Sequence, residues 1–460
     1  MQQTTLFDID LIRRYDKAGP RYTSYPTAVQ FHSGFDEAAY REYAQNSNAT
    51  LKPLSLYVHI PFCDTVCFYC ACNKVATKNR RRAEPYLAHL RQEMAFQSAL
   101  FNRERPVTQL HWGGGTPTFP SHAEMRELMQ GISDNFQLLN DDSGEYSIEI
   151  DPRETQFDTV AFLRELGFNR MSLGVQDFGP KVQKAVNRIQ SEEQTFAVLE
   201  AARREGFKSI SIDLIYGLPH QSVDSFSKTL DKIVAEKPDR LSVFNYAHLP
   251  TLFKPQRRIN EADLPSPAEK LAILQHTINH LMDAGYIYIG MDHFALPDDE
   301  LAQAQRNGTL YRNFQGYSTH ANCDLIGLGI TSISQVGNSY SQNVKTLDEY
   351  YAQLDGGHIP VFRGVALNDD DRLRRAVITQ LICHFILDIP AIEEEFQIDF
   401  KDYFSVEWAE LEAMQDDGLL VRSLERIEIL PAGRLLVRNI CMTFDVYLRE
   451  NQERRFSKVI

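Results

Sequence analysis

The sequence contains no run of about 18 apolar residues, the length that a helix needs to cross a bilayer, so no membrane span is expected. Its first residues, MQQTTLFDIDLIRRYDKAGPRY, lack the apolar core of a secretory signal. Positive charge is also scarce: 48 Lys and Arg stand against 62 Asp and Glu, a net charge of −14. Nucleic acids and anionic membrane surfaces repel such a chain, so neither is an expected partner.

Cysteine is scarce too, with 7 residues in a chain of 460, and an odd number does not suit a disulfide framework. Four of them nevertheless lie within ten residues, at Cys63, Cys67, Cys70 and Cys72. Clustered thiols indicate a metal site in a reducing compartment, so the expected location is the cytoplasm. The cluster follows a strand-like run at 54–60, and α/β folds place their chemistry at the carboxyl ends of strands.

Two kinds of metal site remain open for this cluster. Structural zinc usually draws two separated cysteine pairs from different parts of a chain, and no second Cys or Cys-His pair lies nearby in this sequence. An iron–sulfur cubane suits three closely spaced thiolates, here in a C-x3-C-x2-C spacing, and would keep one iron open to a ligand. A lesser alternative is a set of incidental buried cysteines.

Apolar and β-branched runs alternate with segments of helical spacing, which predicts parallel β/α units with right-handed crossovers. An open sheet and a barrel both satisfy this pattern. The expected strands are 54–60, 107–112, 145–150, 170–176, 209–216 and 240–246.

The length exceeds that of one ordinary domain, so a large catalytic domain and a smaller one are expected. Residues 1–50 are predicted to form an arm that serves as a lid, and 51–365 the α/β catalytic domain. Within the latter, 307–346 is rich in Gly, Ser, Asn and Thr and is expected to form loops with a short helix. Residues 366–460 are expected to be mainly helical and winged-helix-like, with a hairpin near 419–430.

The C-x3-C-x2-C spacing is the signature of radical SAM enzymes, and the chain further resembles the oxygen-independent coproporphyrinogen III oxidases (coproporphyrinogen III dehydrogenases). The resemblance extends from the N-terminal arm nearly to the C-terminus. The segments that carry it are YVHIPFCDTVCFYCAC at 57–72, PRYTSYPTA at 20–28, HWGGGTPT at 111–118, EIDPRE at 149–154, NRMSLGVQDF at 169–178, IDLIYGLP at 212–219, FNYAHLP at 244–250, GMDHFA at 290–295 and NFQGYSTH at 313–320.

The resemblance implies a partial (β/α)6 barrel that holds one [4Fe-4S] cluster and two S-adenosyl-L-methionine (SAM) molecules. Cys63, Cys67 and Cys70 match the cluster ligands, whereas Cys72 is outside the ligand set. Residues that match the first SAM site are Tyr57, Gly114, Glu149 and Ile333. Residues that match the second are Tyr69, Gly115, Thr116, Gln176, Arg188, Asp213 and Ala247. Position 69 is Tyr where Phe is expected in close relatives, so its hydroxyl needs a partner.

The implied reaction is the oxidative decarboxylation of two propionates of coproporphyrinogen III to vinyl groups, which gives protoporphyrinogen IX in heme biosynthesis. A 5′-deoxyadenosyl radical abstracts the hydrogen, and a flavodoxin- or ferredoxin-type donor supplies electrons to a monomeric enzyme. Substrate carboxylates need basic receivers, with Arg21 the first candidate and 80–82 the alternative. Gln315 and His320 are further candidates for the cavity, whereas His293 and His320 are equally plausible as structural hydrogen-bonding histidines. A heme chaperone of the same lineage is the alternative function.

Overall fold

The computed structural model describes residues 7–155 and 157–450, which form two compact units. Unit 1 combines the N-terminal residues up to Gln30 with Ile287–Ala321 and the chain from Leu367. Unit 2 consists of Phe31–Tyr286 and Asn322–Ala366. The ends of the expected arm and C-terminal domain, residues 1–6 and 451–460, lie outside the described residues, as does residue 156.

Unit 2 is built on parallel strands whose order in the sheet is their order in the sequence. Their bounds are β1 (Leu54–Ile60), β4 (Pro106–Gly114), β6 (Glu145–Ile150), β7 (Arg170–Gln176), β8 (Ser209–Tyr216) and β9 (Arg240–Asn245). This succession confirms the α/β class and the six parallel β/α units. The strands therefore end at one edge, and the loops that follow them gather there.

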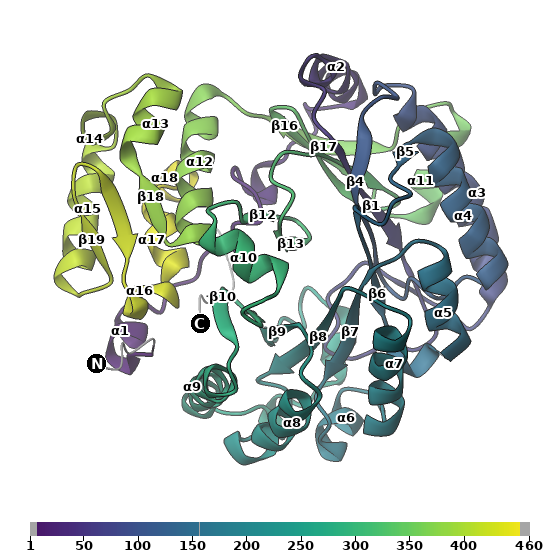
Figure 1. Cartoon of the computed structure of the whole chain (residues 1–460), viewed down its shortest axis with the longest axis horizontal. Coiled ribbons are helices and arrows are strands. Elements are labelled where there is room, and N and C mark those ends of the chain that lie inside the picture. The colour runs from purple at the N-terminus through teal and green to yellow at the C-terminus, as the bar shows by residue number, and fades with distance from the viewer. Residues whose placement is uncertain (1–6, 156, 451–460) are drawn as a thin grey trace. The chain divides into compact units, whose positions relative to one another are not determined.

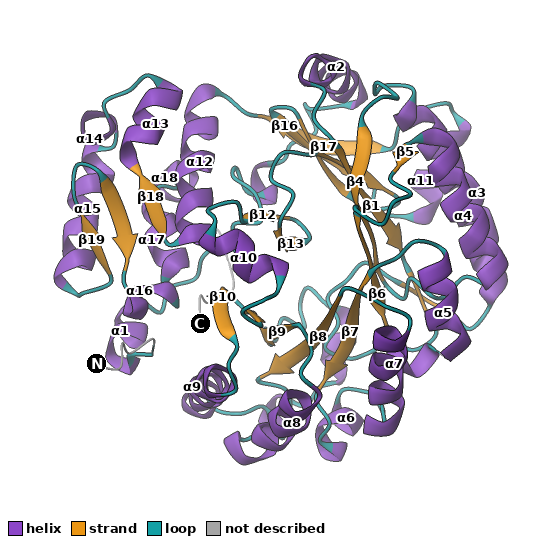
Figure 2. Ribbon diagram, in the orientation of Figure 1, coloured by secondary structure: helices purple, strands orange, loops and turns teal. Residues whose placement is uncertain are grey.

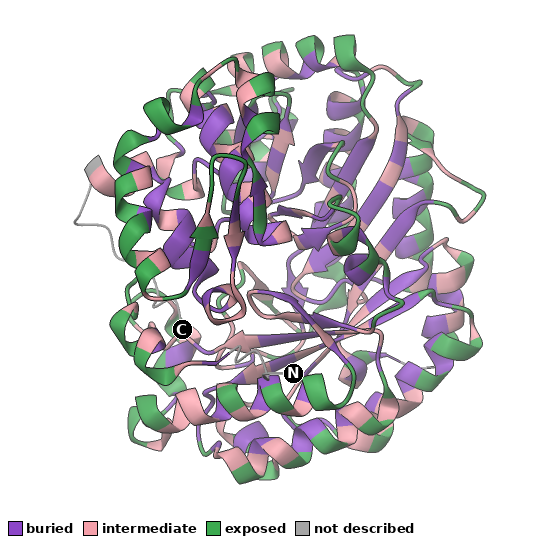
Figure 3. Cartoon of the chain, turned by 60° about the vertical axis from the view of Figure 1, so that its left-hand side comes forward, coloured by how far each residue is buried: buried purple, intermediate pink, exposed green. Residues whose placement is uncertain are grey.

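The helices of unit 2 line up along one side of its strands (Figures 1 and 2). They are α2 (Glu37–Ser47), α3 (Ala83–Ser98), α4 (His122–Asn135), α5 (Phe157–Glu165), α6 (Pro180–Ala185), α7 (Glu192–Arg204), α8 (Val223–Glu236), α9 (Pro267–Asp283) and α11 (Leu347–Asp355). Figure 3 shows buried residues on one side of these helices and exposed residues on the other, which is the amphipathic pattern read from the sequence. No helix in the described part of the chain has the length and apolar character to cross a bilayer.

The prediction that 307–346 forms loops with a short helix is wrong. The later part of this segment forms three strands that continue the sheet beyond β1, and a fourth follows after α11. They are β14 (Asp324–Leu328), β15 (Ile333–Val336), β16 (Ser339–Asn343) and β17 (Val361–Ala366). β14 is parallel to β1, and the next pairings are antiparallel. β propensity depends on what a residue packs against, so the existing sheet edge overrides a Ser- and Asn-rich composition.

Unit 1 is mainly helical beyond Leu367, as expected, and the hairpin near 419–430 is confirmed. Its helices are α1 (Ile9–Arg14), α10 (Glu300–Arg306), α12 (Asp369–His384), α13 (Ile389–Phe396), α14 (Phe400–Tyr403), α15 (Ser405–Asp416), α16 (Pro431–Arg434), α17 (Val437–Thr443) and α18 (Val446–Glu450). Its strands are β10 (Ile287–Gly290), β11 (His293–Ala295), β12 (Tyr311–Asn313), β13 (Gly316–Ser318), β18 (Ile386–Asp388), β19 (Leu420–Arg422) and β20 (Arg426–Ile429).

Candidate functional site

The clustered cysteines lie on a loop that is closed at its base. Directly after β1, the short strand β2 (Phe62–Cys63) pairs in parallel with β3 (Val75–Ala76). The Val75 N–H donates to the Pro61 carbonyl at 2.7 Å. The residues between the two short strands, which include Cys67, Cys70 and Cys72, are therefore presented together at the carboxyl end of β1.

The thiols of this loop differ in their tendency to ionise. All seven cysteines are free thiols, and Cys63 and Cys67 are buried. A hydrogen bond from Cys72 lowers the pKa of Cys70 to about 5 against the effect of burial, with the Lys74 ammonium adding to the shift. Thiolate is the form that binds metal. No three His, Cys, Asp or Glu side chains among the described residues are arranged to hold one metal ion.

Two arginines point at the Cys67 sulfur. An Arg188 N–H lies 3.6 Å from it and an Arg153 N–H lies 3.5 Å from it. Both guanidiniums are held by Asp151, which accepts from Arg188 at 3.1 and 3.2 Å. Arg188 is buried and its Nε has no hydrogen-bond partner. A thiolate, and a cluster bound through it, would be stabilised by these two positive charges.

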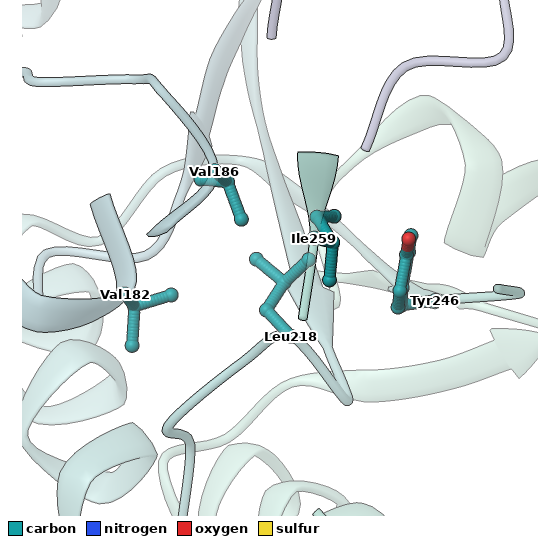
Figure 4. Packing of buried hydrophobic residues seen from close by; sticks show 5 residues of the cluster. All are labelled: Val182, Val186, Leu218, Tyr246 and Ile259. Atoms are coloured by element: carbon teal, nitrogen blue, oxygen red, sulfur yellow. The ribbon is translucent and has the colours of Figure 1, made fainter. Parts of the chain in front are cut away.

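The cysteine loop is anchored to the segment that follows β7. Phe68 N–H donates to the Val186 carbonyl, and the Asn187 side chain donates to the Val66 carbonyl, both at 2.9 Å. The Tyr69 side chain packs against a hydrophobic cluster, whose five buried members are drawn in Figure 4. That cluster consists of Val182, Val186, Leu218, Tyr246 and Ile259.

The Tyr69 hydroxyl has a hydrogen-bond partner, as expected from the sequence, and the partner is Cys67. Burial raises the pKa of Tyr69, and the hydrogen bond with Cys67 raises it further. Gln256 fixes the same residue from the other side. Its amide N–H donates to the carbonyls of Tyr69 at 3.0 Å and Ala247 at 3.2 Å, and its oxygen accepts from Leu249 N–H at 2.6 Å. Gln256 therefore joins two residues predicted for the second SAM site.

A row of polar side chains crosses the strands at the level of the cysteine loop. The rings of Tyr57 and His111 stack with centroids 5.8 Å apart. His111 bonds the Ser147 hydroxyl at 2.6 Å and the Glu149 carboxylate at 3.3 Å. Glu149 also accepts from Gly114 N–H at 3.1 Å. His111 thus links Tyr57 to Glu149, and Glu149 in turn contacts Gly114; all three are residues predicted for the first SAM site.

The Glu149 carboxylate is surrounded by protein on a central strand, yet its side chain is still 44% exposed. Burial opposes ionisation, but the bonds from His111 and Gly114 outweigh it and lower the pKa of Glu149. On β8, Asp213 accepts from the Ser172 hydroxyl at 3.1 Å. Burial, and after it the charge of Glu149, raise the pKa of Asp213 to about 6. The two carboxylates therefore share one region of the strand edge.

The remaining predicted residues line the same edge. Gln176 ends β7 with a φ of 69°, an uncommon value for a residue with a side chain. A Cβ added at Gly174 would meet the Gln176 amide and the Arg188 guanidinium at 3.1 Å each, so both lie beside that position. Ile333 begins β15, and its carbonyl would be 2.7 Å from a Cβ at Gly327, the β14 partner of Tyr57.

Gly115 is required by a close approach between backbones. Its N–H donates to the Ile60 carbonyl at 2.8 Å, and Thr116 N–H donates to the Phe62 carbonyl at 2.8 Å. A Cβ at Gly115 would lie 2.8 Å from Pro61 backbone atoms and 2.7 Å from the Phe62 oxygen. From the sequence, the glycine run was expected to let a ligand approach the backbone closely. In the structure, Gly115 also lets the backbone at the start of the cysteine loop approach closely.

Gly115→Ala should therefore displace the cysteine loop and reduce cluster loading, measured as iron and sulfide content after anaerobic reconstitution. Gly131→Ala is the matched control. It lies within α4, where an added Cβ meets only ordinary contacts from 3.4 Å outward, and Ala there is expected to stabilise the helix by about 0.5–1 kcal/mol. Equal iron content in the two variants would contradict this account of Gly115.

Several residues that are important at the site were not identified from the sequence. They are His111, Asp151, Arg153 and Gln256. The first three lie inside the motifs HWGGGTPT and EIDPRE, so their motifs were a usable signal, whereas Gln256 stands in a short 3-10 turn without one. The alternative substrate receivers at 80–82 have exposed side chains, and Arg80 pairs with Asp64. Arg21, His293, Gln315 and His320 belong to unit 1.

Known proteins share both the fold and the motifs of this chain. Residues 57–233 match the radical SAM superfamily model, and residues 367–436 match the HemN C-terminal domain model. The solved coproporphyrinogen III oxidase from Escherichia coli, described as a radical SAM enzyme, matches with a TM-score of 0.92 and 50% identity over 97% of this chain and 100% of that chain. The fold and the cysteine loop therefore define a radical SAM enzyme.

Curated relatives narrow the class further. An oxygen-independent coproporphyrinogen III oxidase of Pseudomonas aeruginosa is 58% identical over 460 residues, which is 100% of both chains. One from Escherichia coli is 51% identical over 455 residues, covering 99% of this chain and 98% of the relative. This chain belongs to the family of oxygen-independent coproporphyrinogen III oxidases.

Proposed function

We propose that this chain converts coproporphyrinogen III to protoporphyrinogen IX by oxidative decarboxylation of two propionate side chains, without oxygen. The observation that carries the proposal is the sequence identity of 58% and 51% between this chain and two oxygen-independent coproporphyrinogen III oxidases, over nearly the whole of each chain. Each propionate loses one hydrogen atom, one electron and carbon dioxide, and a vinyl group remains. The electron passes to an acceptor outside the enzyme.

Membership in the family implies a [4Fe-4S] cluster and SAM. The donor set fits them: three cysteines on one closed loop, one with a strongly lowered pKa and one facing two guanidiniums. When bound, the cluster and SAM would supply the one-electron radical chemistry that removes a hydrogen atom from the substrate. Cys63, Cys67 and Cys70 would hold the cluster, and two SAM molecules would occupy the two predicted residue sets.

The chain's own residues bind and orient these ligands. Glu149 is ionised at neutral pH because its pKa is lowered, so it can accept hydrogen bonds from amino or hydroxyl groups of a ligand. His111 is stacked on Tyr57 and holds the Glu149 carboxylate in place. The buried Arg188 Nε is an unused donor beside Cys67 that a carboxylate or hydroxyl ligand would satisfy.

The proposal includes the surroundings of the reaction. The enzyme acts as a monomer. Its compartment is the cytoplasm, since the thiol ligands suit a reducing environment. A flavodoxin- or ferredoxin-type protein supplies electrons to the cluster. The N-terminal arm shields the substrate radical from solvent, because an exposed carbon radical would be quenched.

The test is an anaerobic assay of the reconstituted enzyme with SAM, dithionite and coproporphyrinogen III, followed by mass spectrometry. We expect two losses of carbon dioxide per macrocycle, together with methionine and 5′-deoxyadenosine. Cleavage of SAM with an untouched macrocycle would overturn the proposed substrate and favour a heme chaperone. Zinc in place of iron and sulfide would overturn the radical chemistry itself.

Asp213→Asn should lower activity by about tenfold or more while the iron content stays normal, because we assign Asp213 to SAM binding rather than to iron binding. Asn keeps the size of the side chain and can still accept from Ser172, so the fold is expected to survive. Asp283→Asn, at the exposed end of α9, is the control and should retain full activity. Iron loss in the Asp213 variant would contradict its assignment.

A further inference from the structure

Unit 1 brings three arginines and one aspartate close together from distant parts of the sequence. Arg21 comes from the N-terminal residues, Arg312 from β12 and Arg438 from α17. Asp292, in the turn between β10 and β11, accepts from Arg21 at 2.6 Å. Arg312 donates to the Arg21 carbonyl at 3.4 Å, and Arg438 donates to the Pro20 carbonyl at 2.8 Å. We name Arg21, Arg312, Arg438 and Asp292 the arginine cluster.

Positive charge exceeds negative charge in this cluster. Burial, and after it the positive charges of Arg21 and Arg312, lower the pKa of Arg438 to about 10 against the effect of Asp292. The neighbouring Asp445 is engaged elsewhere, since it accepts from the Tyr22 hydroxyl at 3.0 Å and from a backbone N–H. A group of like charges in a partly buried place is unfavourable without an anion.

The donors of the cluster are not all used. Arg312 is only 7% exposed, and its Nη1 has no hydrogen-bond partner. The Tyr317 ring lies under this guanidinium, 4.8 Å away, so stacking occupies one face of the group while its Nη1 can donate to an anion. Arg21 is 36% exposed, so a ligand from solvent can reach its side chain. A carboxylate matches both the charge and the planar geometry.

We propose that the arginine cluster is a binding site for a carboxylate of the substrate. The inference rests on the proposed function, because coproporphyrinogen III carries four propionate carboxylates and the chain as a whole is acidic. In the free enzyme Asp292 occupies the anion position beside Arg21. An arriving propionate takes over part of this contact and satisfies Arg312, so that the macrocycle is held by an arm residue and a strand residue together.

The first experiment is a fluorescence titration of the reconstituted full chain with coproporphyrin III, the oxidised macrocycle with four carboxylates, and with its uncharged tetramethyl ester. The wild-type chain should prefer the acid. Arg21→Gln should weaken binding of the acid by about tenfold or more and leave binding of the ester unchanged. Arg13→Gln, an exposed arginine of α1 in the same unit, is the matched control and should bind as the wild type does. Equal affinities of the two variants for the acid would overturn the inference.

A second variant separates ligand binding from a structural ion pair. Asp292→Asn removes the competing carboxylate and should tighten binding of coproporphyrin III, whereas a purely structural pair would give weaker binding and overturn the inference. In turnover, Arg21→Gln should raise KM for coproporphyrinogen III with little change in kcat. If the wild-type enzyme forms protoporphyrinogen IX but Arg21→Gln leaves KM unchanged, the inference about the arginine cluster is wrong and the proposed function stands. If the wild type leaves the macrocycle untouched, the proposed function fails.

Discussion

Cys67→Ser is expected to abolish cluster assembly and all SAM cleavage while the chain stays folded. The serine hydroxyl does not ionise at neutral pH, so the site loses one of the three thiolates that a cubane with an open iron needs. The two guanidiniums that face the Cys67 sulfur would then face a neutral oxygen. Iron and sulfide analysis after anaerobic reconstitution, with the visible absorption of the cluster, measures the loss.

Cys323→Ser is the matched control for this prediction. Cys323 lies outside the loop and its sulfur is 3.3 Å from the Thr108 hydroxyl, a hydrogen bond that serine can keep. This variant should assemble a normal cluster and keep its activity. A normal cluster in Cys67→Ser would remove Cys67 from the ligand set and reopen the choice among the thiols of the loop.

Arg105→Met is expected to lower the free energy of unfolding by about 3–5 kcal/mol, the largest stability effect predicted for the chain. Arg105 is 1% exposed and pairs with Asp324 at the start of β14. It also donates to the Lys52 carbonyl at 2.6 Å and the Ser47 hydroxyl at 2.8 Å. Without it, the Asp324 carboxylate stays buried with no opposite charge. Guanidinium chloride unfolding at pH 7 measures the change.

Two further variants show whether the buried charge causes this loss. Arg91→Met removes a half-buried arginine that pairs at 3.1 Å with Glu127, whose side chain is 66% exposed, and it should cost no more than about 1 kcal/mol. Adding Asp324→Leu to Arg105→Met should recover part of the stability, because no uncompensated charge then remains. Equal costs for the Arg105 and Arg91 variants would contradict the role of the buried ion pair.

The sequence alone determined the elements whose signals are local. The strand at 54–60 matches β1 residue for residue, and the runs at 145–150 and 209–216 match β6 and β8, because the apolar pattern of each strand lies within its own segment. The C-x3-C-x2-C spacing placed the cysteines on the loop after β1, which the pairing of β2 with β3 confirms. Short motifs such as HWGGGTPT and EIDPRE also indicated the family, because each motif is read within one segment of the chain.

Only the tertiary structure decided which residues meet across long separations. The polar segment near 333–343 became strands because an open edge of the sheet was there to pair with, a fact that no local pattern records. His111 reaches Glu149, and Gln256 reaches Tyr69, across neighbouring strands and loops. Arg21 and Asp292 lie far apart in the sequence and become an ion pair only after unit 1 has folded. Such contacts depend on how the elements pack, so the spacing of residues along one segment does not determine them.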